Sequence, residues 1–535
     1  MPRPKVIHQP RTQRALREGI STLVNAIAPT LGPTPRRSIA QNQTKFELLD
    51  DGGLIARRII ALPEQEADVG AMLLRQVLWK AREHVGDGAA TTAILYERIY
   101  NEGLRFIAAG ADPMRLRACL TSLLPQVTER LQAQARQLRG DAELKALALS
   151  ICYDEEMAAV LGEVVSTIGR YGQVDIRAGH GRGLEYNYVE GSYWKGGAQS
   201  KEMLRGYARP VAELRDAAIL VTDMDIEEAR ELVPLMSLAL RRGLRQLLLI
   251  AHSISETGLS VLLDKRLREK ITTIVVKIDS FLVDEQARAC EDIALLTGAR
   301  PLLQKAGDSL ERVRESDFGE ARWVWADDKS FGFASGKGDP RQLRAQARSL
   351  REAYAAAKED DDRQRLLERL GRLNGGLATV YVGGIAEDEI RQRKEIAERT
   401  VRALRSASAD GVIPGGGMAL LRCRDWLLQA AEAQADLESR AARLIMAKAV
   451  EAPIRQLLTN AGYDASEILA RLGRAGEDAG FDALRGEIVD VAAAGILDVA
   501  RVQVEALRRA VTSAGLALTI DALVLHREPE TMTDP

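Results

Sequence analysis

The order of secondary-structure signals along the chain is the feature that most constrains its fold. Helical periodicity dominates up to about Gly140, and a short mixed segment follows. Apolar runs then alternate with helices, a pattern typical of an α/β domain. Mixed and helical patterns return afterwards in the reverse order, to about Leu516. This mirrored order predicts nested domains: one domain is inserted into a second, and the second is inserted into a third. The joints are expected at the glycine clusters near Gly191 and Gly375.

Length and composition agree with a large globular protein. The 535 residues suggest about three domains, and a hydrophobic content of 46% with only 4% aromatic residues favours helices. The expected fold class is therefore multidomain α/β, mostly helical. A net charge of −2 gives no sign of a basic surface, so no nucleic acid is expected as a partner.

Cysteine spacing and hydropathy limit which metal sites, membrane segments and cellular locations are expected. Neither the four cysteines nor the five histidines have the spacing of metal ligands, so no zinc site is expected. No apolar run reaches about 18 residues, so no membrane span is expected. The first residues are polar and contain no apolar signal core. These features predict a cytoplasmic protein with reduced thiols.

Local patterns predict the individual elements. Helices are expected at Thr12–Ala28, from about Asp68 to Arg136 with breaks at Gly86–Gly88 and Gly110–Pro113, at Ala142–Gly169, Glu227–Arg241 and Ser255–Arg268, and from Glu387 onward. Strands are expected at Lys45–Leu49, Val174–Arg177, Leu184–Tyr188, Ala218–Thr222, Gln246–Ala251, Ile271–Ile278 and Leu377–Val382. Gly332–Gly338 should close the α/β domain, and Asp339–Leu373 should form a helical hairpin with Asp360–Asp362 in its turn.

The stretch His84–Thr92 carries the clearest chemical signal. Gly86-Asp87-Gly88 interrupts two helices, so that the second helix starts at a glycine-rich turn. The free N–H groups and the positive end of the helix dipole favour an anion at such a turn. Asp87 adds a hard oxygen ligand of the kind that Mg²⁺ prefers. The alternative interpretation is a plain connector between two helices.

Two other turns stand out before this stretch. Pro29, Gly32 and Pro33 end the first helix within the segment Ala28–Pro33. The segment Asp50-Asp51-Gly52-Gly53 is a tight turn with two carboxylates. Ordinary turn chemistry also explains Asp and Gly there, so this turn alone does not indicate a site.

Together these motifs resemble those of group I chaperonins. Five segments agree in order and spacing: Ala28–Pro33, Gly86–Thr92, Gly110–Met114, Gly411–Gly417 and Gly495–Asp498. The chain resembles a divergent bacterial GroEL-type 60 kDa chaperonin subunit over essentially its whole length. The resemblance implies the chaperonin fold with nested domains: equatorial (1–133 and 412–535), intermediate (134–190 and 377–411) and apical (191–376).

The resemblance also implies a nucleotide site for ATP and Mg²⁺, with K⁺ as a further ion. Carried over by position, the nucleotide-binding residues would be Thr30, Leu31, Gly32, Pro33, Asp50, Asp87, Gly88, Ala89, Ala90, Thr91, Gly416, Asp482, Ala483, Leu484 and Asp498. Asp87 would bind the metal, and Asp51 matches the family's second catalytic carboxylate. The implied partners are further copies of the chain in a seven-membered ring, single or double, together with non-native polypeptides and an optional co-chaperonin.

The chain departs from the family at the catalytic position. In the family an aspartate of the intermediate domain positions the attacking water, and counting back from Gly415–Gly417 puts that position on Arg399. The neighbouring Glu398 should point elsewhere, because one helical residue is about 100° of rotation. An arginine can stabilise phosphate charge but cannot accept a proton at neutral pH. Slow or absent ATP hydrolysis is therefore expected.

The phosphate loop and the client-binding face depart as well. Ala89 and Ala90 replace two of the family's threonines, and Asp50 replaces its lysine. In the apical segment Ala198–Met203 only Met203 keeps large apolar character. The remaining client-binding candidates are Val233, Met236, Leu259 and Leu263, for which core packing is the alternative.

Two functions follow from these features. The first is a chaperonin that binds ATP and assists the folding of non-native proteins inside an oligomeric ring. The alternative is a divergent paralogue that binds ATP, hydrolyses it poorly or not at all, and acts as a binding or scaffold protein. An unrelated small-molecule enzyme has little support, because no nucleophile–base constellation appears outside the nucleotide motifs.

Overall fold

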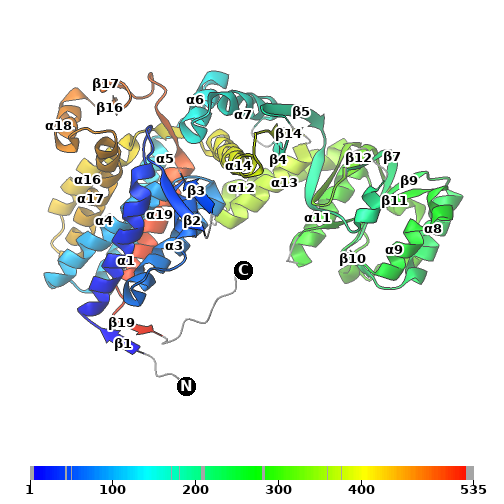
Figure 1. Cartoon of the computed structure of the whole chain (residues 1–535), viewed down its shortest axis with the longest axis horizontal. Coiled ribbons are helices and arrows are strands. Elements are labelled where there is room, and N and C mark those ends of the chain that lie inside the picture. The colour runs from blue at the N-terminus through cyan, green and yellow to red at the C-terminus, as the bar shows by residue number, and fades with distance from the viewer. Residues whose placement is uncertain are drawn as a thin grey trace. The chain divides into compact units, whose positions relative to one another are not determined.

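The computed structural model describes residues 5–42, 45–49, 51–169, 172–179, 181–205, 211–279, 283–357, 360–374, 376–476 and 478–525. The chain forms two compact units (Figure 1). Unit 1 comprises Met1–Ser166 and Glu395–Pro535, and unit 2 comprises Thr167–Lys394. The chain therefore leaves unit 1 once and returns to it once. The finer three-domain division stays a prediction.

Long helices with continuous apolar faces build unit 1. They are α1 (Arg11–Ile27), α3 (Gln65–Val85), α4 (Ala89–Ala108), α5 (Pro113–Ala133), α17 (Leu437–Asn460) and α19 (Ala500–Ala517). Together they enclose one large core, in which α1 lies against α3 and α19 lies against α4 (Figure 1). A Cβ atom on Gly19 of α1 would lie 1.7 Å from the carbonyl oxygen of Ala67, so only glycine permits this close helix packing.

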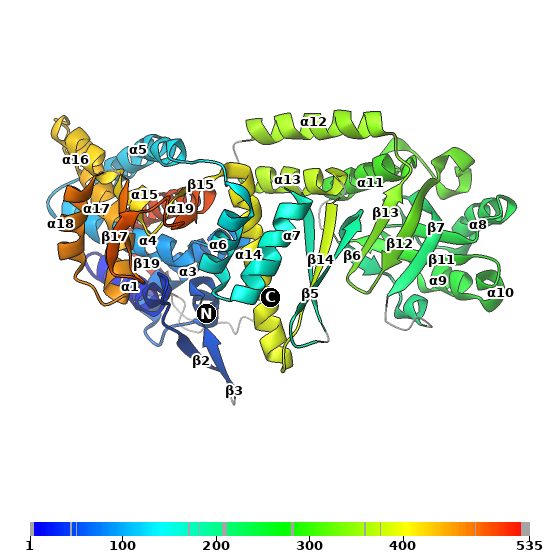
Figure 2. The same cartoon turned by 90° about the horizontal axis from the view of Figure 1, so that it is seen from above.

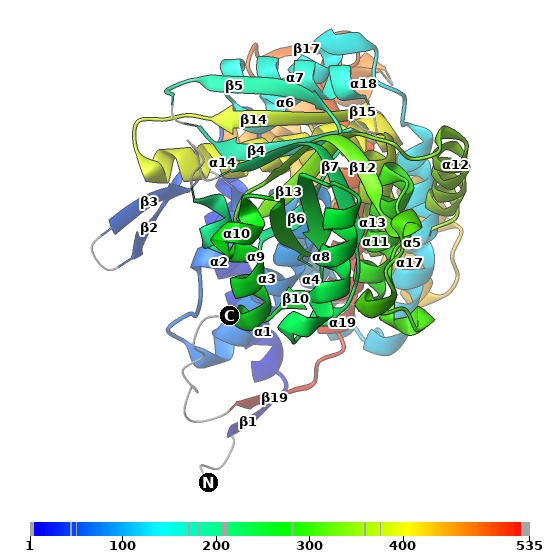
Figure 3. The same cartoon turned by 90° about the vertical axis from the view of Figure 1, so that its right-hand side faces the viewer.

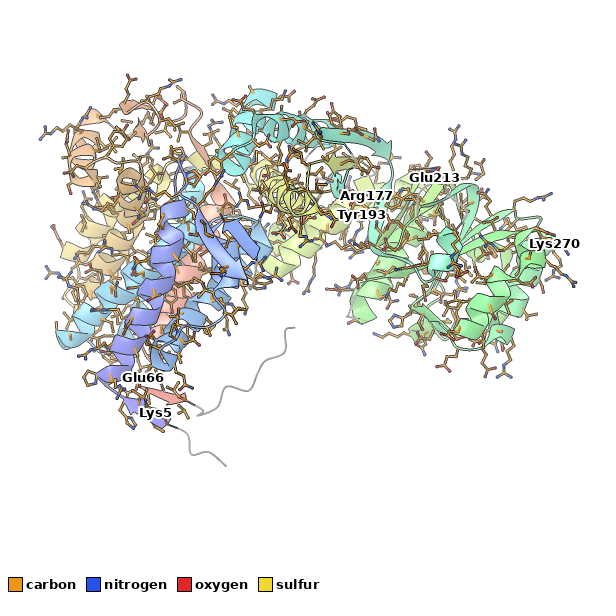
Figure 4. All side chains as sticks on the ribbon, in the orientation of Figure 1. Lys5, Glu66, Arg177, Tyr193, Glu213 and Lys270 are labelled. Carbon is orange, nitrogen blue, oxygen red and sulfur yellow. The ribbon has the colours of Figure 1, made fainter. Side chains whose placement is uncertain are left out.

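Shorter elements complete unit 1. The remaining helices are α2 (Gly52–Arg58), α6 (Gly140–Cys152), α15 (Met418–Leu421), α16 (Arg424–Glu432) and α18 (Ala465–Ala475), together with residues 155–166 of α7 (Glu155–Ile168) and residues 395–410 of α14 (Glu387–Asp410). The strands form the pairs β1 (Lys5–His8) with β19 (Ala522–Leu525), β2 (Ser38–Asn42) with β3 (Lys45–Leu49), β15 (Val412–Pro414) with β18 (Leu497–Val499), and β16 (Ala479–Asp482) with β17 (Glu487–Asp490). Glu66 ties β1 to α3, because its carboxylate lies 2.7 Å from Lys5 Nζ (Figure 4).

Unit 2 contains two main sheets and a short parallel pair of β8 (Asp225–Ile226) with β10 (Ser253–Ile254). One is closed, with strands in the order β11-β6-β13-β12-β7-β9, and the other has the order β4-β14-β5 (Figures 2 and 3). Their bounds are β4 (Gln173–Ala178), β5 (Leu184–Glu190), β6 (Ser192–Ala198), β7 (Ala212–Val221), β9 (Gln246–Ile250), β11 (Thr272–Ile278), β12 (Gly319–Ala326), β13 (Ser330–Gly336) and β14 (Gly376–Val382). The helices are α8 (Leu232–Arg241), α9 (Glu256–Leu263), α10 (Lys265–Arg268), α11 (Val283–Thr297), α12 (Pro340–Ala356) and α13 (Asp360–Asn374).

Arg177 of β4 joins the two sheets of unit 2. Its guanidinium lies 2.8 Å from Asp327 and 4.5 Å from the ring centroid of Trp325, both on the β12 side. The Tyr193 ring stacks on the same tryptophan at 6.5 Å. The ion pair and the cation–π contact of Arg177 therefore link the open sheet to the closed sheet, whereas the Tyr193–Trp325 stack lies within the closed sheet.

Most predicted elements are confirmed, but two details are wrong. The helix expected at Ser255–Arg268 is divided by Asp264, which caps α10. Asp360–Asp362 lies in the first turn of α13 and not in the turn between the two helices, because α13 begins at Asp360. Gly332–Gly338, expected to close the α/β domain, lies largely in β13, the last strand of the closed sheet along the chain. A Cβ on Gly332 would lie 2.7 Å from the Trp325 ring, so glycine lets that ring pack there.

The strands β6 and β12 and the helix α11 were not predicted. Their apolar residues alternate irregularly, and only the closed sheet gives them a buried side. Within the part of the chain that the structure describes, no helix has the length and apolar character needed to cross a membrane.

Candidate functional site

The glycine turn before α4 has the backbone geometry of an anion site. Gly86 and Gly88 adopt positive φ angles of 78° and 86°, and Gly88 is the N-cap of α4. The first helical hydrogen bond runs from the Thr92 N–H to the Gly88 carbonyl at 2.9 Å. The N–H groups of Ala89, Ala90 and Thr91 come before this hydrogen bond, in the first turn of α4, where the helix dipole is positive.

Two other loops converge on this turn. A Cβ atom on Gly52 would lie 3.4 Å from the Ala90 nitrogen and 3.6 Å from Thr30 Oγ1, so Thr30, Gly52 and Ala90 are neighbours. The predicted phosphate-side residues from the first helix end, the Asp51 turn and the glycine turn are thus brought together. Asp50 lies outside the described residues.

Side chains that the sequence analysis missed hold the Ala28–Pro33 segment in place. Asn460, at the end of α17, donates from Nδ2 to the carbonyls of Ala28 (2.8 Å) and Leu31 (2.7 Å). The Tyr153 hydroxyl donates to the Gly32 carbonyl at 3.1 Å. Both residues are far from this segment in the sequence, and no local pattern marks them.

Carboxylates gather beside the glycine turn. Asp51 caps α2, and its Oδ1 accepts the Leu54 N–H at 2.8 Å. Burial raises the pKa of Asp87, the charge of Arg399 and a bond from the Gly88 N–H lower it, and the charge of Asp51 raises it again. Burial and the charge of Asp87 raise the pKa of Asp498 to about 7, although a bond from Gln503 opposes this. This concentration of negative charge would be relieved by a cation.

Arg399 of α14 supplies one positive charge to this cluster. Its Nη1 donates to Asp51 Oδ2, and its Nη2 donates to the Ile151 carbonyl at 2.7 Å. A Cβ on Gly86 would lie 3.1 Å from the Arg399 carbonyl, so α14 lies directly on the glycine turn. Glu398 is exposed to solvent. The structure therefore places Arg399, and not Glu398, against Asp51.

The β15–β18 pair forms another side of the site. Asp498 of β18 pairs in register with Ile413 of β15, and the loop after β15 contains Gly416, which has a φ of 65°. A Cβ on Gly415 would lie 2.9 Å from the Leu497 backbone, so this loop crosses β18 closely.

The turn after β16 carries the remaining nucleotide candidates. Asp482 accepts the Leu484 N–H at 2.9 Å and so fixes the turn. Ala483 packs against the small core that also contains Phe481 and Ile496. Leu484 is 67% exposed. Their role toward the adenosine part of a nucleotide stays a prediction.

The donor set fits a metal ion held jointly by protein and phosphate. In the described ranges, no group of three or more His, Cys, Asp and Glu side chains could hold a metal by itself. Mg²⁺ usually binds one or two carboxylates and completes its coordination with phosphate oxygens and water. Asp87, with its raised pKa and its place before Gly88, fits that arrangement.

The predicted client-binding residues differ widely in exposure. Met203 and Met236 are 2% and 6% exposed and lie in a core of unit 2, where they pack with Leu262. Leu259 and Leu263 are partly buried against the same core. Val233 is 57% exposed. Of the five, therefore, only Val233 presents most of its surface to solvent, which weighs against a client-binding role for Met203 and Met236 in this conformation.

The comparison with protein families defines the class of this protein. The model of the TCP-1/cpn60 chaperonin family matches residues 23–528. The chain belongs to the TCP-1/cpn60 chaperonin family, and the predicted chaperonin fold is confirmed.

Two solved structures are similar to this chain over nearly its whole length. Both are of the chaperonin gp146 from the bacteriophage EL 2 (Pseudomonas aeruginosa), in the presence of ATP-BeFx. Crystal form I has a TM-score of 0.76 and 21% sequence identity, and form II has 0.70 and 20%. Each comparison covers 98% of this chain and 99% of the other. At this identity the likeness shows the fold.

Proposed function

We propose that the chain is a subunit of a chaperonin ring that binds ATP with Mg²⁺ in unit 1 and hydrolyses it slowly. The observation that carries this proposal is the contact between Arg399 and Asp51. Both oxygens of Asp51 are bound in this structure, one by the Leu54 N–H and the other by the Arg399 guanidinium, so Asp51 can accept a proton from water only after its contact with Arg399 opens. Arg399 itself has no basic lone pair at neutral pH.

The phosphate side of the site supports binding more strongly than hydrolysis. The glycine turn offers backbone donors at a helix N-terminus, and Asp87 would hold Mg²⁺, which would offset phosphate charge. Ala89 and Ala90 contribute no side-chain donors, so the loop has fewer hydrogen bonds for a transition state than a threonine-rich loop.

The finer assignments belong to the same proposal. We infer a group I, GroEL-type subunit with the equatorial, intermediate and apical boundaries given above, cytoplasmic, in a seven-membered ring of one or two layers. Non-native polypeptides are the proposed partners, and a co-chaperonin and K⁺ are optional. Size-exclusion chromatography with light scattering distinguishes a monomer, a single ring and a double ring.

Nucleotide binding and hydrolysis must be measured together to test the proposal. We expect the wild type to bind ATP and to release phosphate slowly in a single turnover. Arg399→Asp should speed hydrolysis at least tenfold, because it supplies a carboxylate and frees Asp51. Equal single-turnover rates in the two proteins would contradict the role assigned to Arg399, and absence of ATP binding would contradict the proposal as a whole.

The alternative is a chaperonin that folds its clients with full ATP turnover. The observation in its favour is Asp498 on β18, a further carboxyl group close enough to Asp87 to feel its charge, which would be available to accept a proton from water. Capture and refolding of an unfolded model protein, with and without ATP, separates the two. The slow-hydrolysis proposal predicts weak, ATP-independent capture.

A further inference from the structure

The buried contact of Arg399 lies beside the glycine turn before α4. The side chains of Arg399 and Asp51 are only 12% and 8% exposed. The Arg399 backbone lies against Gly86, one residue before Asp87. Its charge also acts on Asp87, the residue that fits Mg²⁺. The guanidinium charge thus acts on two carboxylates at this turn, Asp51 and Asp87.

The partners of this guanidinium are weaker than a phosphate. One arm binds a single oxygen of Asp51, and the other binds the neutral carbonyl of Ile151, the next-to-last residue of α6. A phosphate offers several anionic oxygens that the planar fork of an arginine can bind in pairs. Exchange of Asp51 for phosphate would therefore increase the charge-assisted hydrogen bonds of Arg399.

Asp51 can release the arginine without losing all of its partners. Its Oδ1 keeps the bond from the Leu54 N–H, which caps α2. The turn at Ala89 and Ala90 lacks side-chain donors, so a donor from α14 would supply what the loop itself does not. The same helix begins at Glu387 in unit 2, so Arg399 lies on an element that both units share.

We propose that Arg399 recognises the terminal phosphate of a nucleoside triphosphate, and that it reaches this phosphate by exchanging its ion pair with Asp51. This inference rests on the proposed nucleotide site. It makes Arg399 the residue that distinguishes a triphosphate from a diphosphate. The exchange also releases Asp51 only when a triphosphate is bound.

The test is the affinity of the full-length protein for AMP-PNP and for ADP, measured by isothermal titration calorimetry with Mg²⁺. Arg399→Ala should weaken AMP-PNP binding about tenfold to a hundredfold, the effect of losing a charge-assisted bond. ADP binding should change less than about threefold. Arg399→Gln, which keeps the length of the side chain, should show the same selective loss if Arg399→Ala folds poorly. Arg391→Ala is the matched control, because Arg391 lies on the same helix, has a side chain that is 71% exposed, and pairs with Asp388 one turn away at 3.6 Å.

Asp51→Asn tests the exchange itself. Asparagine still caps α2, but it no longer competes as an anion for Arg399. AMP-PNP affinity should therefore rise a few fold while ADP affinity stays near that of the wild type. A fall in AMP-PNP affinity would overturn the exchange.

Other outcomes separate this inference from the proposed function. Equal losses for ADP and AMP-PNP in Arg399→Ala, or a gain for both, would overturn phosphate recognition while leaving the nucleotide site intact. No binding of either nucleotide to the wild type would overturn both the site and this inference.

Discussion

Each unit of this chaperonin contains a buried arginine–carboxylate pair, and the two pairs differ in kind. In unit 2, Arg369 of α13 binds both oxygens of Asp292 of α11, at 2.8 and 2.7 Å. Asp292 is completely buried. In unit 1, Arg399 gives one arm to Asp51 and the other to a carbonyl, beside the further carboxylates Asp87 and Asp498.

The difference shows how similar residues serve stability in one place and binding in another. The pair in unit 2 is closed, since the Arg369 guanidinium binds both oxygens of the Asp292 carboxylate and leaves neither oxygen available to a third group. The pair in unit 1 is open, because Arg399 divides its two arms between one carboxylate oxygen and a neutral carbonyl, and we propose that a ligand with more negative charge replaces Asp51 there. Burial alone does not distinguish the two, but the geometry of the fork and the neighbouring charges do.

The largest expected effect is on the closed pair. Arg369→Ala leaves Asp292 buried without its counter-charge and should lower the free energy of unfolding by about 3–5 kcal/mol. Urea denaturation followed by tryptophan fluorescence measures this, since Trp194, Trp323 and Trp325 belong to unit 2. Arg365→Ala, on the same helix but in a half-exposed pair with Glu285 at 3.1 Å, should cost less than about 1 kcal/mol. Equal effects of the two would contradict the comparison.

The next largest effect concerns Asp498, whose carboxyl group is close to that of Asp87. The folded protein keeps the Asp498 proton up to about pH 7, whereas the unfolded chain releases it near 3.8. The free energy of unfolding should therefore fall as pH rises from about 4 to about 7, by on the order of 2–4 kcal/mol. Asp498→Asn should remove that fall and be more stable than the wild type at pH 8. Thermal unfolding across this pH range checks it, with the exposed Asp425→Asn as control; identical profiles for Asp498→Asn and the wild type would refute it.

A third prediction concerns the backbone next to the open pair. A Cβ atom on Gly88 would lie 2.7 Å from Val502 Cγ1, and Gly88 itself has a positive φ. Gly88→Ala should cost about 2–3 kcal/mol and abolish nucleotide binding. Gly110 also has a positive φ, but no atom would lie within 4 Å of an added Cβ. Gly110→Ala should therefore cost about 1 kcal/mol of stability and leave nucleotide binding unchanged. Calorimetric unfolding of both variants decides whether the collision matters beyond the backbone strain.

The smallest effect should be the stability cost of breaking the open pair. Arg399→Ala leaves Asp51 with the Leu54 N–H, so the loss should be about 1–2 kcal/mol. Urea denaturation next to Arg369→Ala gives a direct ranking of the two pairs. A loss as large as that of Arg369→Ala would mean that the pair in unit 1 is also structural.

Much of the geometry of the proposed nucleotide site was predictable, because its signals are local. Positive φ at Gly86, Gly88 and Gly416 is a property that glycine alone tolerates well, so the residues mark the turns by themselves. The position of Arg399 on a helical face followed from the period of 3.6 residues. The contact with Asp51 did not follow, because 348 positions separate the two residues.

The exposure of the apolar residues of unit 2, by contrast, was not predictable from the sequence. Val233 and Met236 lie within one helical turn, yet one is exposed and the other is in the core. Their apolar character is the same in the sequence, and only the packing of α8 against the closed sheet decides which side is covered. Client-binding residues could therefore not be separated from core residues by composition.

The sequence by itself determined the family, the nested order of segments and the glycine turns, since these depend on local backbone preference and on the order of residues. The tertiary structure decided which charges meet. It placed Arg399 on Asp51, Asn460 on the Ala28–Pro33 segment and Arg369 on Asp292, all through contacts between residues far apart in the chain. The physical reason is that charge and hydrogen bonding act over a few ångströms in space, a distance that spacing along the sequence does not specify.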